Sequence, residues 1–420
     1  AAQPAYEPRT GSVLHVLHNS LPYRRTGAAN RTQGLLSGLV REHYSITGLT
    51  PPGFPHDDVK DDTAIVERHE IGGVVYQHLL NDGVVQPRFP VQDFIATYSA
   101  SIIEHARAES AALIHAASNS YNALAALTAS RQLGLPAIYE VRGLYEEVRR
   151  SKNEAHALTP QYRFAVHLET LAATEADRVI TITDGLRDTL ISRGVPAESI
   201  TVVPNGVDTT RFQPLPRDED LARRYGLEDA VVIGYLGSLN WYEGHELLFE
   251  AFARVHEQHP EVRLLIVGSG SRLAQLQRLR AELGLEDEIL MPGSVPFEEV
   301  EAHYSLVDIA PITRLSSPVT ESVSPLKPFE AMAMGKAVVS SDVAIMTEIV
   351  DDERTGLLFR KGDVDSLVEV LTRLVVDPAL RDRLGTEARE WVVAERDWSI
   401  LAGRVAAVYR ELGVDPDPGS

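Results

Sequence analysis

The sequence predicts an α/β fold in which two domains, each built on an open and mostly parallel sheet, follow one another along the chain. At 420 residues the chain is longer than one hydrophobic core usually organises. Short β-branched apolar runs alternate with longer stretches whose apolar residues recur at helical spacing. This alternation stops at residues 200–216 and then starts again, which indicates two Rossmann-like domains in tandem.

The first domain is predicted over residues 1–206. Its first strand is SVLHVLHNSLP, which a glycine-containing turn, RRTGAAN, connects to a helix from Arg31 to His43. Further strands are predicted at residues 44–50, 112–118, 136–143 and 178–183, and residues 122–134 are a predicted crossover helix. We expect all of these strands to join one sheet.

The second domain is predicted over residues 207–396, because Asn205-Gly206 favours a turn and three prolines near it break regular structure. Its predicted helices are 245–259, 272–285 and 328–334, the last capped by Gly335. Its predicted strands are 230–238, 262–271, 288–295, 307–313 and 336–342. Residues 397–420 are expected to form an amphipathic helix, about 399–412, that packs on the first domain and ends in a disordered tail.

The composition excludes several classes of function. The chain has no cysteine, which removes disulfide scaffolds, thiolate zinc sites and cysteine nucleophiles, and suits a reducing cytoplasm. A net charge of −20 disfavours a nucleic acid partner, so any phosphate-bearing ligand must meet a local basic pocket. No apolar run approaches the roughly 18 to 20 residues of a transmembrane helix, and no His and carboxylate spacing indicates a metal site.

The stretch SPLKPFEAMAMGKAVVSSD, residues 324–342, combines features that suit a nucleoside diphosphate. Pro325 and Pro328 bracket a helix start, whose unpaired amides attract phosphate. Lys327 adds a positive charge there, and the carboxylate of Glu330 can accept the hydroxyls of a ribose. The alternative is that Lys327 and Glu330 are a surface pair that contributes a few tenths of a kcal/mol.

This stretch, extended to residue 359, resembles the family 4 retaining glycosyltransferases of the GT-B fold, as do residues 202–214, 234–252 and 397–412. The resemblance spans nearly the whole chain. It implies two facing Rossmann-like domains, a nucleotide-sugar donor held mainly by the second domain, an acceptor held by the first, and no metal or other cofactor. It also implies transfer with retention at the anomeric carbon, and a last helix that crosses back onto the first domain.

The sequence departs from the family pattern at the donor site. The family usually has two glutamates with seven residues between them; Glu330 matches the second, but the first falls on Ser322, and Glu321 lies one position earlier. Where many members have an arginine and a lysine that clamp the diphosphate, this chain has Ser238 and Glu243. We therefore expect Lys327 to supply the positive charge and Glu321 to reach the donor sugar through a shifted loop.

Arg142, in YEVRGLYEE, occupies the place of the family's usual histidine. An arginine cannot act as a base there, but its planar fork can hold the leaving phosphate or an acceptor carboxylate. The alternative is an arginine neutralised by Glu140, Glu146 or Glu147.

The remaining candidates lie in turns after predicted strands. The turn around Gly27 is similar to the family's loop over the donor phosphates, and Arg24, Arg25 and Arg31 make it locally basic, which favours an anionic ligand. Arg31 and His115 are the acceptor-side candidates, although a buried histidine with a backbone partner is an open alternative for His115. The other donor-side candidates are Gly237, Ser238, Val295, Ser324 and Leu326.

The sequence thus predicts a cytoplasmic enzyme that moves a sugar from a nucleoside diphosphate to the hydroxyl of a glycan, a lipid-linked or a small-molecule acceptor, in polysaccharide or glycoconjugate synthesis. Peripheral membrane contact is a further alternative, for which the short basic segment of residues 148–156 is a weak candidate. The alternative is a nucleotide-sugar-binding protein of the same fold without transfer activity, a scaffold or sensor, which the absent arginine and lysine of the donor site favour.

Overall fold

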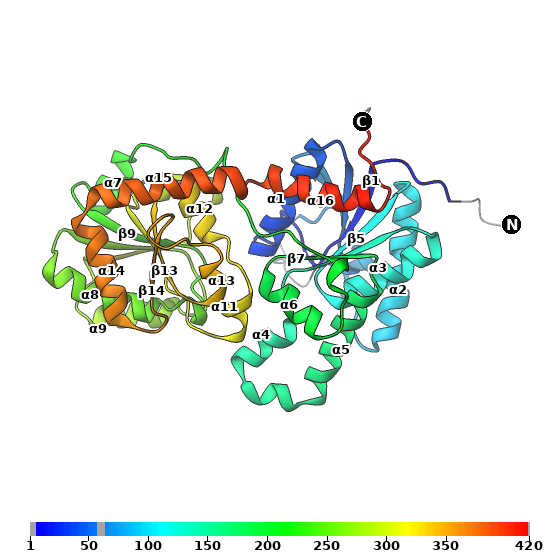
Figure 1. The fold of residues 1–420 in the computed structure, drawn as a ribbon, viewed down its shortest axis with the longest axis horizontal. Coiled ribbons are helices and arrows are strands. Elements are labelled where there is room, and N and C mark those ends of the chain that lie inside the picture. Colours follow the sequence, from blue (N-terminus) through cyan, green and yellow to red (C-terminus); the bar gives the residue numbers. More distant parts are fainter. Residues whose placement is uncertain (1–5, 57–63, 419–420) are drawn as a thin grey trace. The chain divides into compact units, whose positions relative to one another are not determined.

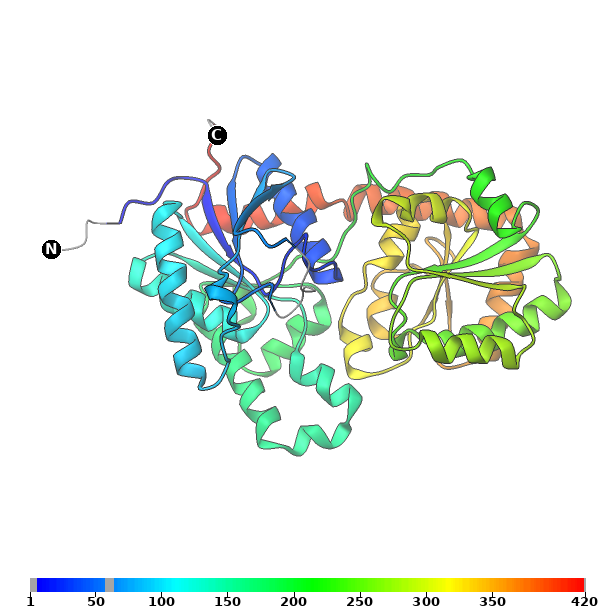
Figure 2. The same cartoon turned by 180° about the vertical axis from the view of Figure 1, so that it is seen from behind.

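The computed structural model describes residues 6–56 and 64–418, and the chain divides into two compact units (Figures 1 and 2). Unit 1 comprises Ala1–Asn205 and Trp398–Ser420, and unit 2 comprises Gly206–Asp397. The predicted boundaries, after residues 206 and 396, each lie one residue from these divisions. Each unit is an α/β domain with a largely parallel sheet, as predicted.

The sheet of unit 1 has the strand order β3-β4-β2-β1-β5-β6-β7-β8, in which only the β3–β4 pair is antiparallel. The sequence prediction missed β3, β4 and β8, which are short and partly exposed. Gly72-Gly73, both with positive φ, joins β3 to β4 and is a hairpin signal that the prediction overlooked. The strands are β1 (Ser12–Val16), β2 (Ser45–Leu49), β3 (Arg68–Ile71), β4 (Val74–Gln77), β5 (Leu113–Ala117), β6 (Ala137–Val141), β7 (Arg178–Thr181) and β8 (Ile200–Val202).

Helix α1 of unit 1 begins four residues earlier than predicted, at Gly27 rather than Arg31. The Thr26 side chain accepts from the backbone N–H of Ala29 at 3.3 Å, which is a typical N-cap and satisfies a group that the helix leaves unpaired. Arg31 therefore lies inside the helix. The helices are α1 (Gly27–Arg41), α2 (Val91–Ala108), α3 (Ser120–Leu133), α4 (Tyr145–Lys152), α5 (Pro160–Glu175), α6 (Asp184–Ser192) and α16 (Trp398–Glu411).

The last helix, α16, packs along α1 (Figure 1). A Cβ atom on Gly34 would lie 2.3 Å from the indole nitrogen of Trp398, and one on Gly38 would lie 2.6 Å from the Cβ of Ala402. The two glycines therefore permit this close packing, and the predicted docking of the last helix on the first domain is what the structure has.

The prediction of a disordered tail is wrong for residues 413–418. Val414 is buried, and its carbonyl accepts from the hydroxyl of Tyr44 at 3.2 Å. The backbone N–H of Asp417 donates to the carbonyl of His43 at 2.9 Å. These contacts hold the segment against unit 1; residues 419–420 lie outside the described residues.

The sheet of unit 2 is parallel throughout, in the order β11-β10-β9-β12-β13-β14. Neighbouring residues along a strand belong to different core clusters, for example Val232 and Ile233, or Val338 and Val339, so both faces of the sheet are covered. The strands are β9 (Val231–Leu236), β10 (Val262–Val267), β11 (Ile289–Gly293), β12 (Ile309–Ile312), β13 (Ala337–Ser341) and β14 (Leu357–Phe359), the last not predicted.

Nine helices of unit 2 surround this sheet among the described residues. Gly335, with φ 70°, follows the end of α12, so the predicted glycine cap is confirmed. The helices are α7 (Glu219–Tyr225), α8 (His245–Gln258), α9 (Leu273–Glu282), α10 (Val300–Ser305), α11 (Pro318–Ser322), α12 (Lys327–Ala333), α13 (Ala344–Thr347), α14 (Val364–Val376) and α15 (Pro378–Glu395). Within residues 6–56 and 64–418, no helix has both the length and the hydropathy needed to cross a bilayer.

The strand order reverses at one point in each sheet. In unit 1, β1 lies between β2 and β5, so the chain first builds toward one edge and then toward the other. In unit 2, β9 lies likewise between β10 and β12. Ligands of open parallel sheets bind at such points, beyond the carboxyl ends of the strands, so the turns after β1, β5, β9 and β12 are where a site is expected.

Candidate active site

Lys327 and Glu243 meet at the reversal point of unit 2. Lys327 is the first residue of α12, and Glu243 ends the turn that follows β9. The ammonium nitrogen of Lys327 lies 2.7 Å from a carboxylate oxygen of Glu243, and the two side chains are only 16% and 3% exposed. The ammonium also lies 5.2 Å from the centroid of the Tyr235 ring. Lys327, the cation predicted for the donor site, is thus held in a defined position by Glu243. Glu243 stands where many members of the family have a lysine.

Gly237, a predicted donor-side residue, makes room for the Lys327 side chain. A Cβ atom on Gly237 would lie 2.2 Å from the Cε of Lys327. A Cβ atom on Gly268 would likewise lie 1.8 Å from the carbonyl oxygen of Gly237, so the loops after β9 and β10 also pack closely. Both positions exclude larger residues. Close packing of the two loops therefore accounts for the glycines in GYLGS and VGSGS, and a dinucleotide-binding motif is not needed to explain them.

Arg314 is a second cation beside Glu243, and the sequence analysis missed it. It follows β12, is 4% exposed, and donates to the carbonyl of Val323 at 2.8 Å. Burial alone would raise the pKa of Glu243, but the charges of Lys327 and Arg314 outweigh burial and hold this pKa below its ordinary value. Its position directly after a strand, in PITRL, is the signal that could have found it.

Glu330 lies on the same helix as Lys327 and is partly buried. The hydroxyl of Tyr304 forms a hydrogen bond with its carboxyl group. Burial raises the pKa of Glu330, while the charges of Lys327 and Arg211 partly oppose this. The structure therefore brings Lys327 and Glu330 together at the carboxyl edge of the sheet.

Glu321 has partners of its own. Its carboxylate accepts from the backbone N–H of Ala344 at 2.6 Å, at the start of α13, and from the ammonium of Lys361 at 2.8 Å. Burial would raise the pKa of Glu321, but these hydrogen bonds outweigh burial and lower it. The carboxylate thus joins α11 to α13, and its predicted contact with a donor sugar stays a prediction.

The other donor-side candidates of unit 2 line the same edge of the sheet. Ser238 is exposed, and its backbone carbonyl accepts from the hydroxyl of Tyr235 at 2.9 Å. Ser324 is buried and Leu326 immediately precedes α12. Val295 is partly buried against the core and follows β11.

Arg142 of unit 1 is bound to Glu140, which was one of the alternatives drawn from the sequence. Its guanidinium donates to the Glu140 carboxylate and to the Thr32 hydroxyl, each at 2.6 Å, and it is 10% exposed. Burial would raise the pKa of Glu140, but Arg142 and Arg31 hold it far below its ordinary range. A role of Arg142 toward a phosphate or carboxylate ligand stays a prediction.

Arg31 makes four hydrogen bonds and an ion pair inside unit 1. It donates to Glu140, to the carbonyls of Val203 and Pro204, and to the side chain of Asn205, over 2.7 to 3.1 Å. It is 2% exposed and lies 6.0 Å from the centroid of the Trp398 ring. Arg31 therefore fixes the segment after β8 and is buried away from any acceptor.

His115 is completely buried under α16. Its Nδ1 lies 2.8 Å from the Tyr409 hydroxyl, which is also 3.0 Å from Nε2 of His15. Burial lowers the pKa of His115 to about 4. The alternative of a buried histidine is thus what the structure has, with a tyrosine rather than the backbone as its partner. Gly27, a predicted donor-side residue, is the exposed first residue of α1, the helix that follows β1.

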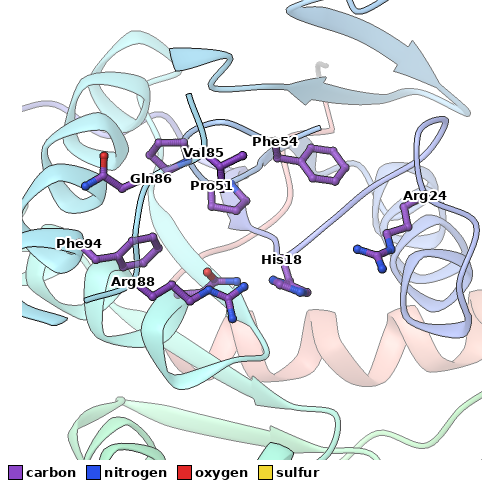
Figure 3. A pocket seen from close by; sticks show the side chains of 10 residues that line it. His18, Arg24, Pro51, Phe54, Val85, Gln86, Arg88 and Phe94 are labelled. Atoms are coloured by element: carbon purple, nitrogen blue, oxygen red, sulfur yellow. The ribbon is translucent and has the colours of Figure 1, made fainter. Parts of the chain in front are cut away.

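A pocket of about 160 Å³ lies at the reversal point of unit 1 (Figure 3). It opens between the segments that follow β1 and β2 and the amino-terminal parts of α2 and α3. The prediction included Arg24 in a basic turn but overlooked the other residues that line the pocket: His18, Pro51, Pro52, Phe54, Val85, Gln86, Arg88, Phe94 and Asn122. Among the described residues, no group of three or more His, Asp or Glu side chains is placed to hold a metal ion.

Two sequence families match the chain. Residues 26–206 match the glycosyl transferase 4-like domain, and residues 218–391 match the glycosyl transferases group 1. Together the two matches cover most of both units.

Individual proteins show the same likeness. The GDP-mannose-dependent alpha-(1-6)-phosphatidylinositol monomannoside mannosyltransferase of Mycolicibacterium smegmatis is 30% identical over 236 residues, 55% of this chain and 62% of that protein. The chain thus matches less than two thirds of the length of this relative.

Among solved structures, the sucrose-phosphate synthase of Thermosynechococcus elongatus has a TM-score of 0.75 at 21% identity, over 96% of this chain and 99% of that chain. Anabaena HepE in complex with UDP-glucose has a TM-score of 0.70 at 17% identity, over 95% and 99%. These likenesses show the GT-B fold. With both domain models matched, the chain belongs to the family 4 glycosyltransferases with the GT-B fold.

Proposed function

We propose that the protein transfers a sugar from a nucleoside diphosphate to an acceptor hydroxyl, with retention of configuration at the anomeric carbon. The observation that carries the proposal is the placement of Lys327 beside Gly237 at the reversal point of unit 2, with Glu330 one helical turn further along α12. Two findings support a nucleotide sugar as the donor. The chain belongs to the glycosyltransferase family, and the name of the Mycolicibacterium relative includes GDP-mannose.

In this mechanism the ammonium of Lys327 stabilises the negative charge that grows on the departing diphosphate. A preorganised charge of this kind acts where the transition state differs from the ground state, and one such donor typically accounts for about 10²- to 10³-fold in rate. The Glu330 carboxylate accepts hydrogen bonds from the ribose hydroxyls. We assign no protein nucleophile; the departing phosphate takes the proton of the acceptor, and no metal or other cofactor is required.

Three residues are predicted to be catalytic, and each of them forms an ion pair within its own unit: Lys327 with Glu243, Arg142 with Glu140, and Glu321 with Lys361. We assign the catalytic cation to Lys327, because it lies beside Gly237 at the reversal point of unit 2. We assign positioning roles to the other two, Arg142 toward Glu140 and α1, and Glu321 toward the start of α13. Polysaccharide or glycoconjugate synthesis and a cytoplasmic location, which the lack of cysteine suits, remain part of the proposal.

The proposal is tested by turnover with a panel of nucleoside diphosphate sugars, offered with sugar and sugar phosphate acceptors. We expect release of nucleoside diphosphate above the background of donor hydrolysis for at least one pair. The coupling constant of the anomeric proton in the product, read by NMR, is expected to match that of the donor. Inversion at this carbon would contradict the retaining mechanism.

A second function is favoured by one observation, the neutralisation of Lys327 by the buried Glu243. A nucleotide-sugar-binding protein without transfer activity could keep this pair as a structural element. The same panel separates the two functions, because a protein that binds the nucleotide but yields no product with any pair is a binding protein.

A further inference from the structure

The pocket of unit 1 has a strongly one-sided charge in an acidic protein. Arg24, Arg88 and His18 are among the ten residues that line it, and none of the ten is Asp or Glu. The chain as a whole has 60 acidic and 40 basic residues, so a lining with this charge departs from the average surface. Figure 3 shows Arg24 and Arg88 reaching toward His18 from opposite sides.

Arg88 is a positively charged member of the lining. Its guanidinium lies 5.8 Å from the ring centroid of Tyr121, and within the described part of the chain it forms no ion pair. The ring of Tyr145 lies 6.3 Å from that of His18.

The rest of the lining is mixed: Gln86 and Asn122 contribute side-chain amides, and five residues are apolar. Pro51, Pro52 and Phe54 follow β2, Val85 lies against Gly53 of this segment, and Phe94 belongs to α2. Flat proline and phenylalanine surfaces suit a ring or an aliphatic body rather than a fully hydrated ion. With about 160 Å³, the pocket is smaller than the roughly 300 to 1,000 Å³ of sites for drug-sized ligands, so it suits one group and not a long chain.

We propose that this pocket binds a phosphate group carried on a ring or an aliphatic body, and that this phosphate belongs to the acceptor. Two guanidinium groups that converge from opposite sides match the charge and the several oxygens of a phosphate dianion. The pocket lies beyond the carboxyl ends of β1 and β2, where an open sheet binds its ligands. The assignment of the phosphate to the acceptor rests on the proposed function, in which unit 2 holds the donor.

The test uses the whole protein and three probes: phenyl phosphate, inorganic phosphate and benzyl alcohol, with binding followed by ligand-observed NMR titration. We expect phenyl phosphate to bind more tightly than either of the other two, because only it offers both the anion and the apolar body. Arg24→Ala and Arg88→Ala should each weaken its binding by about tenfold or more. Arg25→Ala is the matched control, because this arginine neighbours Arg24 but does not line the pocket.

Lys327→Met separates this pocket from the donor site. Phenyl phosphate binding that survives Lys327→Met and is lost in the Arg24→Ala, Arg88→Ala double variant supports the proposal, provided that thermal unfolding shows the double variant to be folded. Binding that is unchanged in the folded double variant, or lost only in Lys327→Met, overturns it. Equal binding of inorganic phosphate and phenyl phosphate overturns the role given to the apolar walls.

The outcome is independent of turnover. If the protein transfers no sugar but binds phenyl phosphate through Arg24 and Arg88, the proposed function is contradicted and the phosphate pocket is supported. If the protein transfers sugar but does not bind phenyl phosphate, only the proposal of a phosphate pocket is contradicted.

Discussion

The ammonium of Lys327 donates to a carboxylate oxygen of Glu243 at 2.7 Å, although the two residues are 84 positions apart in the chain. Both side chains are largely buried, so the pair gains from a low local dielectric and also carries the cost of removing two charges from water. The pair therefore fixes the position of Lys327 and reduces its free positive charge. A diphosphate that binds here must compete with Glu243 for the same ammonium.

Replacement of Lys327 should reduce both turnover and stability. Lys327→Met should slow transfer by about 10²- to 10³-fold, because the departing diphosphate loses its preorganised cation. It should also lower the free energy of unfolding by up to about 3 kcal/mol, because the buried Glu243 loses its hydrogen-bonded cation. The charge of Arg314, which stays beside Glu243, limits this loss. Steady-state kinetics and urea unfolding measure the two effects.

The control for this change is Lys361→Met, at an exposed lysine of the same unit. It should leave turnover within about twofold and stability within about 0.5 kcal/mol. Normal turnover of a folded Lys327→Met protein would remove Lys327 from the mechanism.

Glu330→Gln should weaken the binding of a nucleoside diphosphate and flatten its pH dependence. Burial raises the pKa of Glu330, so the carboxylate that accepts the ribose hydroxyls becomes ionised later than an exposed glutamate as the pH rises. The affinity advantage of the parent protein over the glutamine variant should therefore grow as the pH rises above the usual titration range of an exposed glutamate, whereas the ionisation of the terminal phosphate affects both proteins alike. Calorimetric titration at several pH values measures this, with Glu250→Gln, on the exposed side of α8, as the control. An identical pH profile in the parent protein and in Glu330→Gln would place the ribose elsewhere.

Arg31→Met should destabilise unit 1 strongly. The change removes four hydrogen bonds and an ion pair to Glu140 and to the segment after β8, and it leaves buried carbonyl groups without this donor. Loss of one partner from a buried ion pair typically costs about 3–5 kcal/mol. Urea unfolding should show a loss of this size, against a change within about 0.5 kcal/mol for Arg149→Met on the exposed side of α4. Equal stability of the two variants would mean that Arg31 does not hold the segment.

Acid should destabilise the fold through buried histidines. Burial lowers the pKa of His115 to about 4, whereas an unfolded histidine titrates near 6.5. Its neutral form therefore contributes stability above about pH 6.5, and this contribution is lost as the pH falls toward the pKa of the folded state. Between about pH 7 and about pH 5 the loss for this one group is on the order of 2 kcal/mol.

The check is the stability difference between the parent protein and His115→Asn, measured by urea unfolding at both pH values. The difference should shrink on acidification, because the variant lacks the group that must be protonated. A constant difference for His115→Asn would show that this imidazole does not titrate with unfolding.

The sequence predicted the elements that carry strong periodic patterns and missed those that do not. The β-branched runs of β9, β10 and β13 are buried on both faces, which is why their sequences are apolar except for Arg263 in β10 and for Ser340 and Ser341 at the end of β13. The residues of β3 are exposed or partly buried, so its sequence, RHEI, has no apolar run. The three residues of β14 are too few to show a period.

The candidate site was predictable in part for a similar reason. The helix start at Lys327 and the turn at Gly237 are local features, and the sequence shows both. The pairing of Lys327 with Glu243, and of Arg31 with residues 172 to 174 positions away, depends on how strands and loops come together. No local pattern encodes such pairs, so Arg31 was assigned to an acceptor while the structure gives it a place in the core.

The central claim is that Lys327 of unit 2 receives the diphosphate of a nucleotide sugar. Calorimetric titration of a panel of nucleoside diphosphates into the parent protein, Lys327→Met and Lys361→Met tests it most directly. We predict that at least one nucleoside diphosphate binds the parent protein and Lys361→Met alike, and binds folded Lys327→Met at least about tenfold more weakly. Equal affinity for all three proteins, or no binding of any nucleoside diphosphate to the parent protein, would contradict the claim.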